Sequence, residues 1–376
     1  MSSTVHIVAF DIPFPANYGG VIDVYHKIRC LKNAGVSIIL HCFKYGNKQP
    51  SSELESLSQK VYYYERNTSW INQLSLLPYN VKSRINTELK QNLVKDNFPI
   101  IFEVLHTCYL LKDADLSTRK KIYRHSNIEH DYFIGLAMAE KSFLKKMYLI
   151  VEAMKLKRFE KQITKASCIL SVSENDLAYF KETYPSTLSY YLPSFHQFDT
   201  IESKTGKGDY ILYHGNLSIS ENYNAAIWLI DHVFSKTKHI VIIAGLNPSQ
   251  LLIDKIKKYS HISLKQNCTD AEMTDLISNA HIHCLYTEQG TGLKLKLLNV
   301  LFSGRYVLTN TQMLIGTDLQ NACKIANSAS QFITAIEELF LKSFAQDDIE
   351  KRKTIIAKMD NQQKTNLLLD IISDKK

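Results

Sequence analysis

The segment from residue 288 to 296 combines an acidic side chain, a glycine-rich turn and two lysines. Its members are Glu288, Gly290, Thr291, Gly292, Lys294 and Lys296. Glycine on both sides of a threonine lets the backbone turn tightly and approach a ligand, because no Cβ blocks it. Free N–H groups at a helix start, with the positive end of the helix dipole, favour a bound phosphate. The segment predicts a diphosphate site, and a plain structural turn is the alternative.

A buried strand and an amphipathic helix are predicted on either side of this turn. Residues 280–286 form the strand, and apolar residues recur at helical spacing over 293–301. Gly304 is placed as the helix stop, and 306–309 is the next strand. The turn is not a Walker loop, because Gly-x4-Gly-Lys-Ser/Thr is missing. It is not the Rossmann fingerprint either, since Lys296 occupies the position of the third glycine.

A second glycine turn lies near the N-terminus. Strands are predicted at 5–10 and 37–43, with a helix between them that Gly35 ends. Gly19 and Gly20 follow the first strand, and open α/β sheets bind ligands at the carboxyl ends of their strands. These glycines are therefore a candidate substrate contact, or a turn that only connects strand and helix.

A polar cluster follows the predicted strand 121–124. Its candidate residues are His125, Asn127, Glu129 and His130. Histidine and glutamate can exchange protons or hydrogen-bond a sugar, so the cluster is a candidate reacting centre. A hydrogen-bonded structural turn is the alternative. A metal site is not expected, because Glu129 and His130 are sequence neighbours and would point apart on a helix.

The composition is that of a globular protein large enough for two domains. The chain has 376 residues, of which 45% are hydrophobic and 22% are charged, so it can bury two cores of ordinary size. A net charge of +8 indicates a mildly basic surface, which suits phosphates, an acidic membrane or nucleic acid. Charge alone does not choose among these partners.

The cysteines and the N-terminus predict a cytoplasmic protein. Seven scattered cysteines without a C-x-x-C pair indicate buried thiols in a reducing compartment, rather than a disulfide framework or zinc site. The N-terminus lacks the basic and apolar regions of a signal peptide. No stretch approaches the roughly 18 apolar residues of a membrane span.

Strand and helix patterns alternate in two series, separated by a polar segment with two prolines at 184–208. Such alternation predicts an α/β protein with a doubly wound parallel sheet in each series. The predicted domains are 1–190 and 191–347. A charged helical tail at 348–376 has no strand of its own and is expected to dock on the first domain.

A long helical stretch is predicted from residue 136 to 165. It carries eight basic side chains among many apolar ones. A basic helix with so much apolar surface suits an anionic membrane. The simpler interpretation is a helix that covers a sheet and leaves its lysines in water.

Several motifs together resemble GT-B glycosyltransferases of the retaining family 4 type, and the resemblance spans most of the chain. The matching segments are Pro13-Phe-Pro15, Gly19-Gly20, His125-Ser-Asn127-Ile-Glu129-His130, Gly215-Asn-Leu217 and 288–304. The histidine-rich segment is similar to one in a bacterial subgroup that makes surface polysaccharides, with one inserted serine. The resemblance implies two Rossmann-like domains that face a cleft between them.

The resemblance further implies that the second domain binds a nucleotide-diphosphate sugar. The donor-binding residues would be Gly290, Thr291, Gly292, Lys294, Lys296, Asn299, Gly215 and Asn216. Glu288 would contact the donor sugar, and Asn299 stands where the family has the glutamate that holds the ribose. No metal or cofactor is expected, because backbone amides and lysines would stabilise the departing diphosphate.

The first domain would receive the acceptor, which would be a glycan, a lipid-linked molecule or a protein. The acceptor-side residues would be Gly19, Gly20, His125, Asn127 and Glu129, and His130 joins Glu288 as a catalytic candidate. The protein would work in the cytoplasm, with peripheral contact at an anionic membrane face as an option.

Two further interpretations share the fold. A non-catalytic nucleotide-sugar-binding relative or partner subunit would explain Asn299, and also the missing Arg and Lys pair that many relatives carry after Gly215-Asn-Leu217. A sugar-nucleotide epimerase would use water in place of an acceptor. A nucleic-acid partner is not expected, because the basic residues are spread through helices without an aromatic platform.

Overall fold

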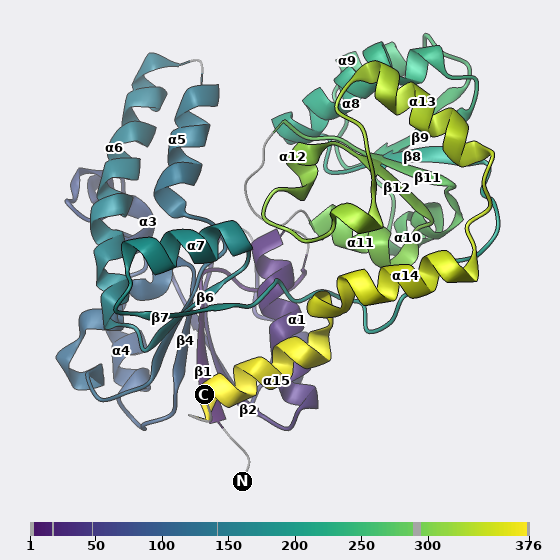
Figure 1. The fold of residues 1–376 in the computed structure, drawn as a ribbon. Coiled ribbons are helices and arrows are strands. Elements are labelled where there is room, and N and C mark those ends of the chain that lie inside the picture. The colour runs from purple at the N-terminus through teal and green to yellow at the C-terminus, as the bar shows by residue number, and fades with distance from the viewer. Residues whose placement is uncertain (1–3, 17–18, 47, 141, 289–294, 374–376) are drawn as a thin grey trace. The chain divides into compact units, whose positions relative to one another are not determined.

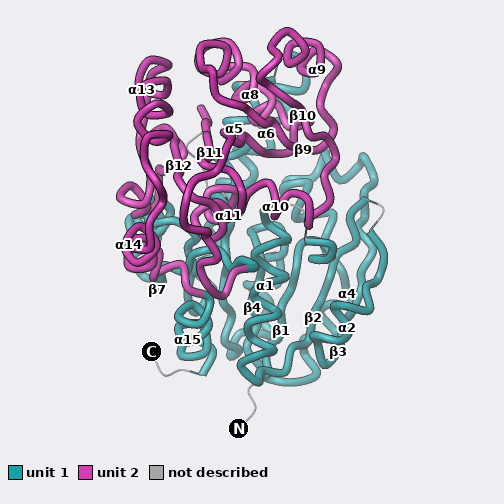
Figure 2. Tube along the Cα trace, turned by 90° about the vertical axis from the view of Figure 1, so that its right-hand side faces the viewer, with its two compact units in different colours: residues 1–197, 361–376 teal, residues 198–360 magenta. Residues whose placement is uncertain are grey.

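A computed structural model describes residues 4–16, 19–46, 48–140, 142–288 and 295–373. The chain divides into two compact units (Figure 2). Unit 1 comprises residues 1–197 and 361–376, and unit 2 comprises residues 198–360. Each unit contains one parallel sheet with helices packed on its two faces (Figure 1).

Unit 1 is built on a parallel sheet of seven strands. In spatial order these are β3 (Lys60–Tyr64), β2 (Ser37–Phe43), β1 (Thr4–Ala9), β4 (Ile100–Glu103), β5 (Lys121–Arg124), β6 (Cys168–Ser171) and β7 (Leu188–Tyr191). The α-helices are α1 (Gly19–Asn33), α2 (Ser52–Leu57), α3 (Tyr79–Lys82), α4 (Thr87–Leu93), α5 (Glu129–Ala139), α6 (Phe143–Glu160), α7 (Glu174–Thr183) and α15 (Asn361–Ile372). The longer 3-10 segments are η1 (Trp70–Leu74), η2 (Leu105–Lys112) and η4 (Lys161–Lys165).

Alternate residues of β1 fill two different cores of unit 1. Ile7, which pairs with Leu40 of β2 and Ile101 of β4, belongs to the core under α1 and α15. Its neighbour Val8 belongs to the opposite core, together with Phe159 of α6. Successive side chains of a strand point to opposite faces, so both faces need helices to cover them.

Unit 2 is built on a parallel sheet of six strands. In spatial order these are β10 (Ile262–Gln266), β9 (Ile240–Gly245), β8 (Tyr210–His214), β11 (Ile282–Leu285), β12 (Tyr306–Thr309) and β13 (Lys324–Ile325). The helices are α8 (Ser220–His232), α9 (Gln250–Ile256), α10 (Asp270–Asn279), α11 (Leu295–Ser303), α12 (Thr311–Leu314), α13 (Ala329–Phe340) and α14 (Gln346–Ile356).

Both sheets have the strand order of a Rossmann-type doubly wound sheet, counted from the first strand of each unit. In such sheets the chain leaves two adjacent strands in opposite directions, and ligands bind beside their carboxyl ends. The strands at this switch point are β1 and β4 in unit 1, and β8 and β11 in unit 2. The predicted α/β class with two doubly wound parallel sheets is confirmed.

Three segments differ from the sequence-based expectation. Strand β7 lies within 184–208, the polar segment that was expected to separate the two series, and the units meet at residues 197 and 198. The long helix predicted from residue 136 is a hairpin of two helices, α5 and α6, and α5 begins earlier, at Glu129. The predicted tail is divided, because α14 belongs to unit 2 and α15 to unit 1. Within the described parts of the chain, no helix has the length and apolarity to cross a membrane.

Candidate active site

The switch point of unit 2 brings together the loops that follow β8 and β11. These strands pair directly, with Ile211 opposite Ile282 and Leu212 opposite His283. Gly215 follows β8, and Thr287 and Glu288 follow β11. Because the strands are parallel, their carboxyl ends lie at the same edge of the sheet, and so do these residues.

Lys296 is fixed at this edge by a chain of hydrogen bonds. Its Nζ, in the first turn of α11, donates to Asn222 Oδ1 of α8 at 2.9 Å. The Asn222 side chain in turn donates from Nδ2 to the carbonyl of Asn216 at 3.0 Å. A Cβ at Gly215 would stand 3.0 Å from Asn222 Cγ, so glycine leaves room for this side chain. Three predicted donor residues, Gly215, Asn216 and Lys296, are therefore grouped around Asn222.

Thr287 is held from two sides and fixes the start of the Glu288 loop. Its hydroxyl donates to Glu221 Oε1 of α8 at 2.6 Å. Asn310, which follows β12, donates from Nδ2 to the Thr287 carbonyl at 2.6 Å and accepts from the Thr287 N–H at 3.3 Å. Glu288 itself is exposed, and Asn299 is half-buried on α11. The predicted residues Gly290, Thr291, Gly292 and Lys294 lie outside the described residues.

Two buried histidines lie in the strands behind this loop. Burial, with a smaller contribution from the charge of Lys296, lowers the pKa of His214 to about 3. Burial also lowers the pKa of His283 well below its ordinary value. A Cβ at Gly304 would stand 2.3 Å from Nε2 of His283, so Gly304 makes room for this ring as well as ending α11. Both rings are neutral at physiological pH.

Arg352 of α14 holds the carboxyl end of α11. Its guanidinium donates to the carbonyls of Leu301 and Gly304 at 3.2 and 2.6 Å, and to the hydroxyl of Ser203 at 3.0 Å. A further hydrogen bond reaches the carbonyl of Arg305. The last carbonyls of a helix have no partner within it, and a buried cation satisfies them here. The helix that carries Lys296 and Asn299 is thereby fixed at its far end.

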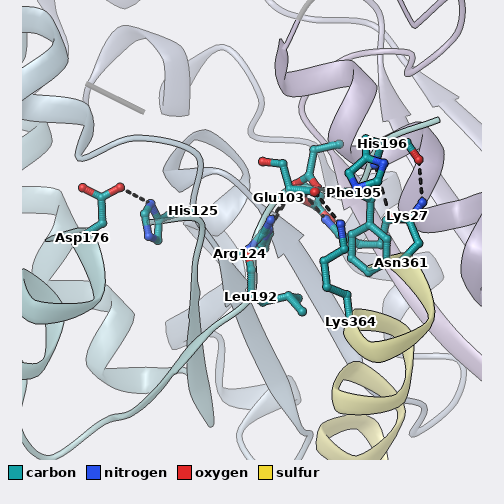
Figure 3. A network of polar contacts seen from close by, with 12 residues as sticks. Lys27, Glu103, Arg124, His125, Asp176, Leu192, Phe195, His196, Asn361 and Lys364 are labelled. Carbon is teal, nitrogen blue, oxygen red and sulfur yellow. Dashed lines mark hydrogen bonds and ion pairs between the residues drawn. The ribbon is translucent and has the colours of Figure 1, made fainter. Parts of the chain in front are cut away.

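Unit 1 has a buried network of four charged side chains beside the carboxyl ends of β4 and β5 (Figure 3). Lys27 Nζ of α1 lies 2.7 Å from Glu103 Oε1 and 3.4 Å from Asp23 Oδ2. Arg124 Nη2 lies 3.1 Å from the same Asp23 oxygen. Burial raises the pKa of Asp23, but the charges of Arg124 and Lys27 outweigh it and lower that pKa to about 2. Burial raises the pKa of Glu103.

Asp23 of this network and two residues of α15 bind the chain segment that leads out of unit 1 (Figure 3). The Phe195 N–H donates to Asp23 Oδ1 at 2.7 Å. Asn361, the first residue of α15, donates from Nδ2 to the carbonyl of His196 at 2.7 Å. Lys364 Nζ donates to the carbonyl of Ser194 at 2.7 Å. The two places where the chain passes between units are therefore joined within unit 1.

The predicted acceptor-side glycines open α1, and His125 is wholly buried. A Cβ at Gly20 would stand 2.7 Å from the Phe10 ring, so the helix starts against that ring. The His125 ring packs on Phe180 with centroids 4.7 Å apart. Its Nδ1 is 4.0 Å from Asp176 Oδ2, but burial lowers the pKa of His125 well below its ordinary value. The ring is neutral, and this contact is not a salt bridge.

The polar cluster after β5 separates into two pairs at the start of α5. Glu129 Oε2 lies 3.1 Å from Nε2 of His106, which is on η2. His130 Nδ1 lies 3.5 Å from Glu160 Oε2 of α6. Asn127 is half-buried in the loop between β5 and α5. The neighbours Glu129 and His130 thus have different partners, as their adjacent positions on a helix predict. Across the described ranges, no group of three His, Cys, Asp or Glu side chains is arranged to hold a metal ion.

Sequence reasoning missed several residues that organise these sites. Asn222, Glu221 and Asn310 position the predicted donor residues, and His106 partners Glu129. The available signal was their placement just after predicted strands or in the first turn of the following helix. Polar residues there lie at the ligand-binding edge of an α/β sheet.

No family model matches this sequence. The chain is 26% identical over 371 residues to the Klebsiella pneumoniae protein "Uncharacterized 44.6 kDa protein in cps region", an alignment that covers 93% of this chain and 91% of the relative. Solved structures match it from end to end. Anabaena Alr3699/HepE in complex with UDP and glucose has a TM-score of 0.66 at 10% identity, with 99% of this chain and 100% of that chain covered.

Two further structures support the same fold assignment. A glycosyltransferase from Rickettsia africae ESF-5 has a TM-score of 0.65 at 14% identity and covers 99% of this chain and 98% of its own. TarM has a TM-score of 0.66 at 10% identity, with 99% of both chains covered. This chain therefore has the GT-B fold of glycosyltransferases, with two doubly wound parallel sheets.

Proposed function

We propose that this chain is a glycosyltransferase that moves a sugar from a nucleotide-diphosphate sugar to an acceptor. The observation that carries the proposal is the end-to-end match in fold with glycosyltransferases, one of which is described in complex with UDP and glucose. The edge of unit 2 supports it independently. A lysine and polar side chains gather there at the switch point, next to the turn in which the sequence predicts a diphosphate site.

Each donor-side residue has a role in this proposal. Lys296 binds the diphosphate from the first turn of α11, where the positive end of the helix dipole adds to its charge. Asn299 lies three residues further along the same side of α11 and hydrogen-bonds the ribose. Glu288 contacts the donor sugar, and Gly290, Thr291, Gly292 and Lys294 complete the phosphate turn. Gly215 and Asn216 close the site on the β8 side.

The chemistry follows from the charge that develops during the reaction. When the glycosidic bond breaks, the leaving diphosphate gains negative charge, and groups that hold it more tightly in the transition state lower the barrier. Lysine and backbone amides supply this stabilisation in the proposal, which needs no metal ion. The acceptor attacks from the side of the leaving phosphate, so the anomeric configuration is retained. His130 and the acceptor-side residues Gly19, Gly20, Asn127 and Glu129 receive the acceptor in unit 1. His125 is wholly buried against Phe180 and supports this loop without contacting the acceptor.

The acceptor class follows from the resemblance to the family 4 subgroup that makes bacterial surface polysaccharides. We assign it to glycans, lipid-linked molecules or proteins. The cytoplasm is the proposed compartment, with an anionic membrane as a peripheral partner.

A thermal-shift screen against UDP, GDP, ADP, CMP and dTDP, with and without magnesium, tests donor binding. A ligand at about 100 times its dissociation constant stabilises a fold by roughly 2.7 kcal/mol. A shift with one nucleotide that does not depend on magnesium is expected, and that nucleotide's sugars are then tested for turnover with a cell-envelope acceptor extract. No shift with any nucleotide would favour the non-catalytic partner subunit, and a shift without turnover would favour the non-catalytic nucleotide-sugar-binding relative. Isomerisation of the sugar nucleotide without an acceptor would favour the epimerase.

A further inference from the structure

Helix α6 is apolar on two faces. One face packs into unit 1 through Leu156 and Phe159, which belong to the core opposite α1. The other face is exposed to solvent, and its residues are Phe143, Leu144, Met147, Val151 and Met154. At about 100° per residue these five lie within roughly 100° of arc, so they form one continuous stripe. A helix with a second apolar face needs a second partner.

A neighbouring segment extends this stripe into a broader apolar surface. Lys155 Nζ of α6 donates to the carbonyl of Gln73 at 2.8 Å, and Glu152 Oε2 accepts the Tyr79 N–H at 2.7 Å. Residues 73–79 therefore run alongside α6. The exposed apolar side chains of this neighbouring segment are Trp70, Ile71, Leu74 and Leu76. We call the nine residues of the stripe and this segment the α6–η1 surface.

The tip of the α5–α6 hairpin carries the most exposed part of the stripe. Figure 1 shows the two helices side by side, extending past the end of the unit 1 sheet. Phe143 and Leu144, where α6 begins at this tip, are 73% and 80% exposed, and Trp70 on η1 is 68% exposed. Aromatic side chains with one apolar side and one polar edge favour the boundary between lipid and water.

The charges of α6 suit an anionic partner. Lys145, Lys146, Lys157 and Arg158 are all exposed. The two carboxylates of the helix are buried and do not reach its exposed face, since Glu152 is 2% and Glu160 is 1% exposed. Segment 67–77 contains no charged residue. Glu140, the carboxylate nearest the tip, is half-buried and accepts the Ser142 N–H at 2.8 Å.

We propose that the α6–η1 surface seats on an anionic lipid bilayer, with Trp70, Phe143 and Leu144 in the interface and the basic side chains of α6 on the lipid headgroups. Apolar area and cationic charge together bind such a membrane, and each nearby Lys or Arg contributes about fivefold to affinity. A second copy of this chain fits less well, because two such surfaces would bring like charges together. This inference rests on the peripheral membrane partner of the proposed function, and it names the surface that meets that membrane.

Binding to lipid vesicles tests the proposal with the full chain and without any donor. Vesicles of phosphatidylcholine with about one quarter phosphatidylglycerol should bind the protein at low salt, and pure phosphatidylcholine vesicles should bind it much less. Because the electrostatic part is screened, binding should weaken at high salt. The fluorescence emission of Trp70 should shift to the blue on binding. The chain has one other tryptophan, Trp228, which stacks on Tyr286 in unit 2 and lies outside the α6–η1 surface. The Trp70→Phe variant should therefore lose the shift.

Matched variants distinguish binding through the α6–η1 surface from non-specific binding to vesicles. Replacing both Phe143 and Leu144 by serine should weaken vesicle binding about tenfold or more, whereas replacing the equally exposed Leu251 and Leu341 of unit 2 should not. Lys146 and Lys157 both flank the same edge of the stripe, so Lys146→Gln with Lys157→Gln should weaken binding about 25-fold. The exposed control pair Lys236→Gln with Lys238→Gln should have little effect.

Three results would overturn the proposal. The first is equal binding to anionic and neutral vesicles, or no binding to either. The second is an equal loss in the control variants. The third is a dimer in solution that the Phe143 and Leu144 serine variant converts to a monomer, which would assign the surface to a second copy. Because the assay contains no nucleotide, each of these results leaves the proposed sugar transfer standing.

Discussion

Lys296 Nζ and Asn222 Oδ1 are joined by a hydrogen bond of 2.9 Å, which ties the first turn of α11 to the first turn of α8. The two helices follow β11 and β8, the strands at the switch point of unit 2. The amide is uncharged and orients the ammonium group. It places a lysine at the carboxyl edge of the sheet, where α/β proteins bind their ligands.

Lys296→Ala should weaken the binding of the preferred nucleoside diphosphate by about tenfold or more, because a hydrogen bond to a charged group contributes about 1.5–3 kcal/mol. Isothermal titration calorimetry measures the change. Lys257→Ala is the matched control, since Lys257 is 69% exposed and lies 3.8 Å from Asp254 on the surface of unit 2. Equal losses in the two variants would show that this edge is not the phosphate site.

Arg352→Met should destabilise unit 2 by about 3 kcal/mol, because it removes the buried guanidinium that donates to the carbonyls of Leu301 and Arg305. The carbonyl of Gly304 keeps the hydroxyl of Ser203 as a donor. Urea unfolding followed by Trp228 fluorescence, in a Trp70→Phe background, reports on unit 2. The control is Lys353→Met on the same helix. Lys353 is exposed and pairs only with Glu350 among the described residues, so its loss should cost under about 0.5 kcal/mol. A similar small cost for Arg352→Met would contradict its role as a cap.

The stability of unit 2 should fall as the pH drops below about 6.5. Burial lowers the pKa of His214 to about 3, so the folded state keeps this ring neutral while the unfolded state binds a proton. The neutral His214 ring makes its full contribution to the unfolding free energy above the pKa that histidine has in the unfolded chain. That contribution is lost as the pH falls towards the pKa of His214 in the folded protein. In the same fluorescence assay, His214→Leu should reduce the slope of unfolding free energy between about pH 4 and 6 by about 1.4 kcal/mol per pH unit. An unchanged slope would mean that His214 already binds its proton in the folded protein.

Lys27→Met should destabilise unit 1 by about 3–5 kcal/mol, because Glu103 and Asp23 would lose a buried counter-charge. Hydrogen exchange at the amides of α1 and β4 locates the effect. The double variant Lys27→Met with Glu103→Leu should recover most of the loss, since a matched apolar pair replaces a matched charged pair. If the double variant is as unstable as the sum of the two single variants, the two side chains do not act as a pair.

The sheets were predictable because their strands are short apolar runs separated by turns and helices. Strand β7 was not predictable in this way, since Leu188–Tyr191 is an edge strand inside a polar segment and its four residues bury little surface. The break between α5 and α6 was also missed, because the residues on both sides of it have helical spacing. Only the packing of the two helices against each other shows that the chain reverses there.

The candidate donor site was predictable to the extent that strand ends set its position. Gly215, Asn216 and Lys296 lie at one edge because β8 and β11 are parallel neighbours. The charged network of unit 1 could not be predicted from the sequence, because Asp23 and Arg124 are 101 residues apart and no local pattern links them. Pairing over such distances depends on the tertiary fold, which local periodicity does not encode.

The division of unit 1 into two pieces sets an order of events during synthesis. Unit 2 is one continuous stretch, whereas unit 1 requires α15, whose Leu368 and Ile371 complete the core beneath α1. Residues 361–376 leave the ribosome after the whole of unit 2. Unit 2 can therefore finish folding while the core of unit 1 still lacks α15. This order is the reverse of the usual one, in which the N-terminal domain folds first. Nascent chains stalled before Asn361 would expose that core to chaperones.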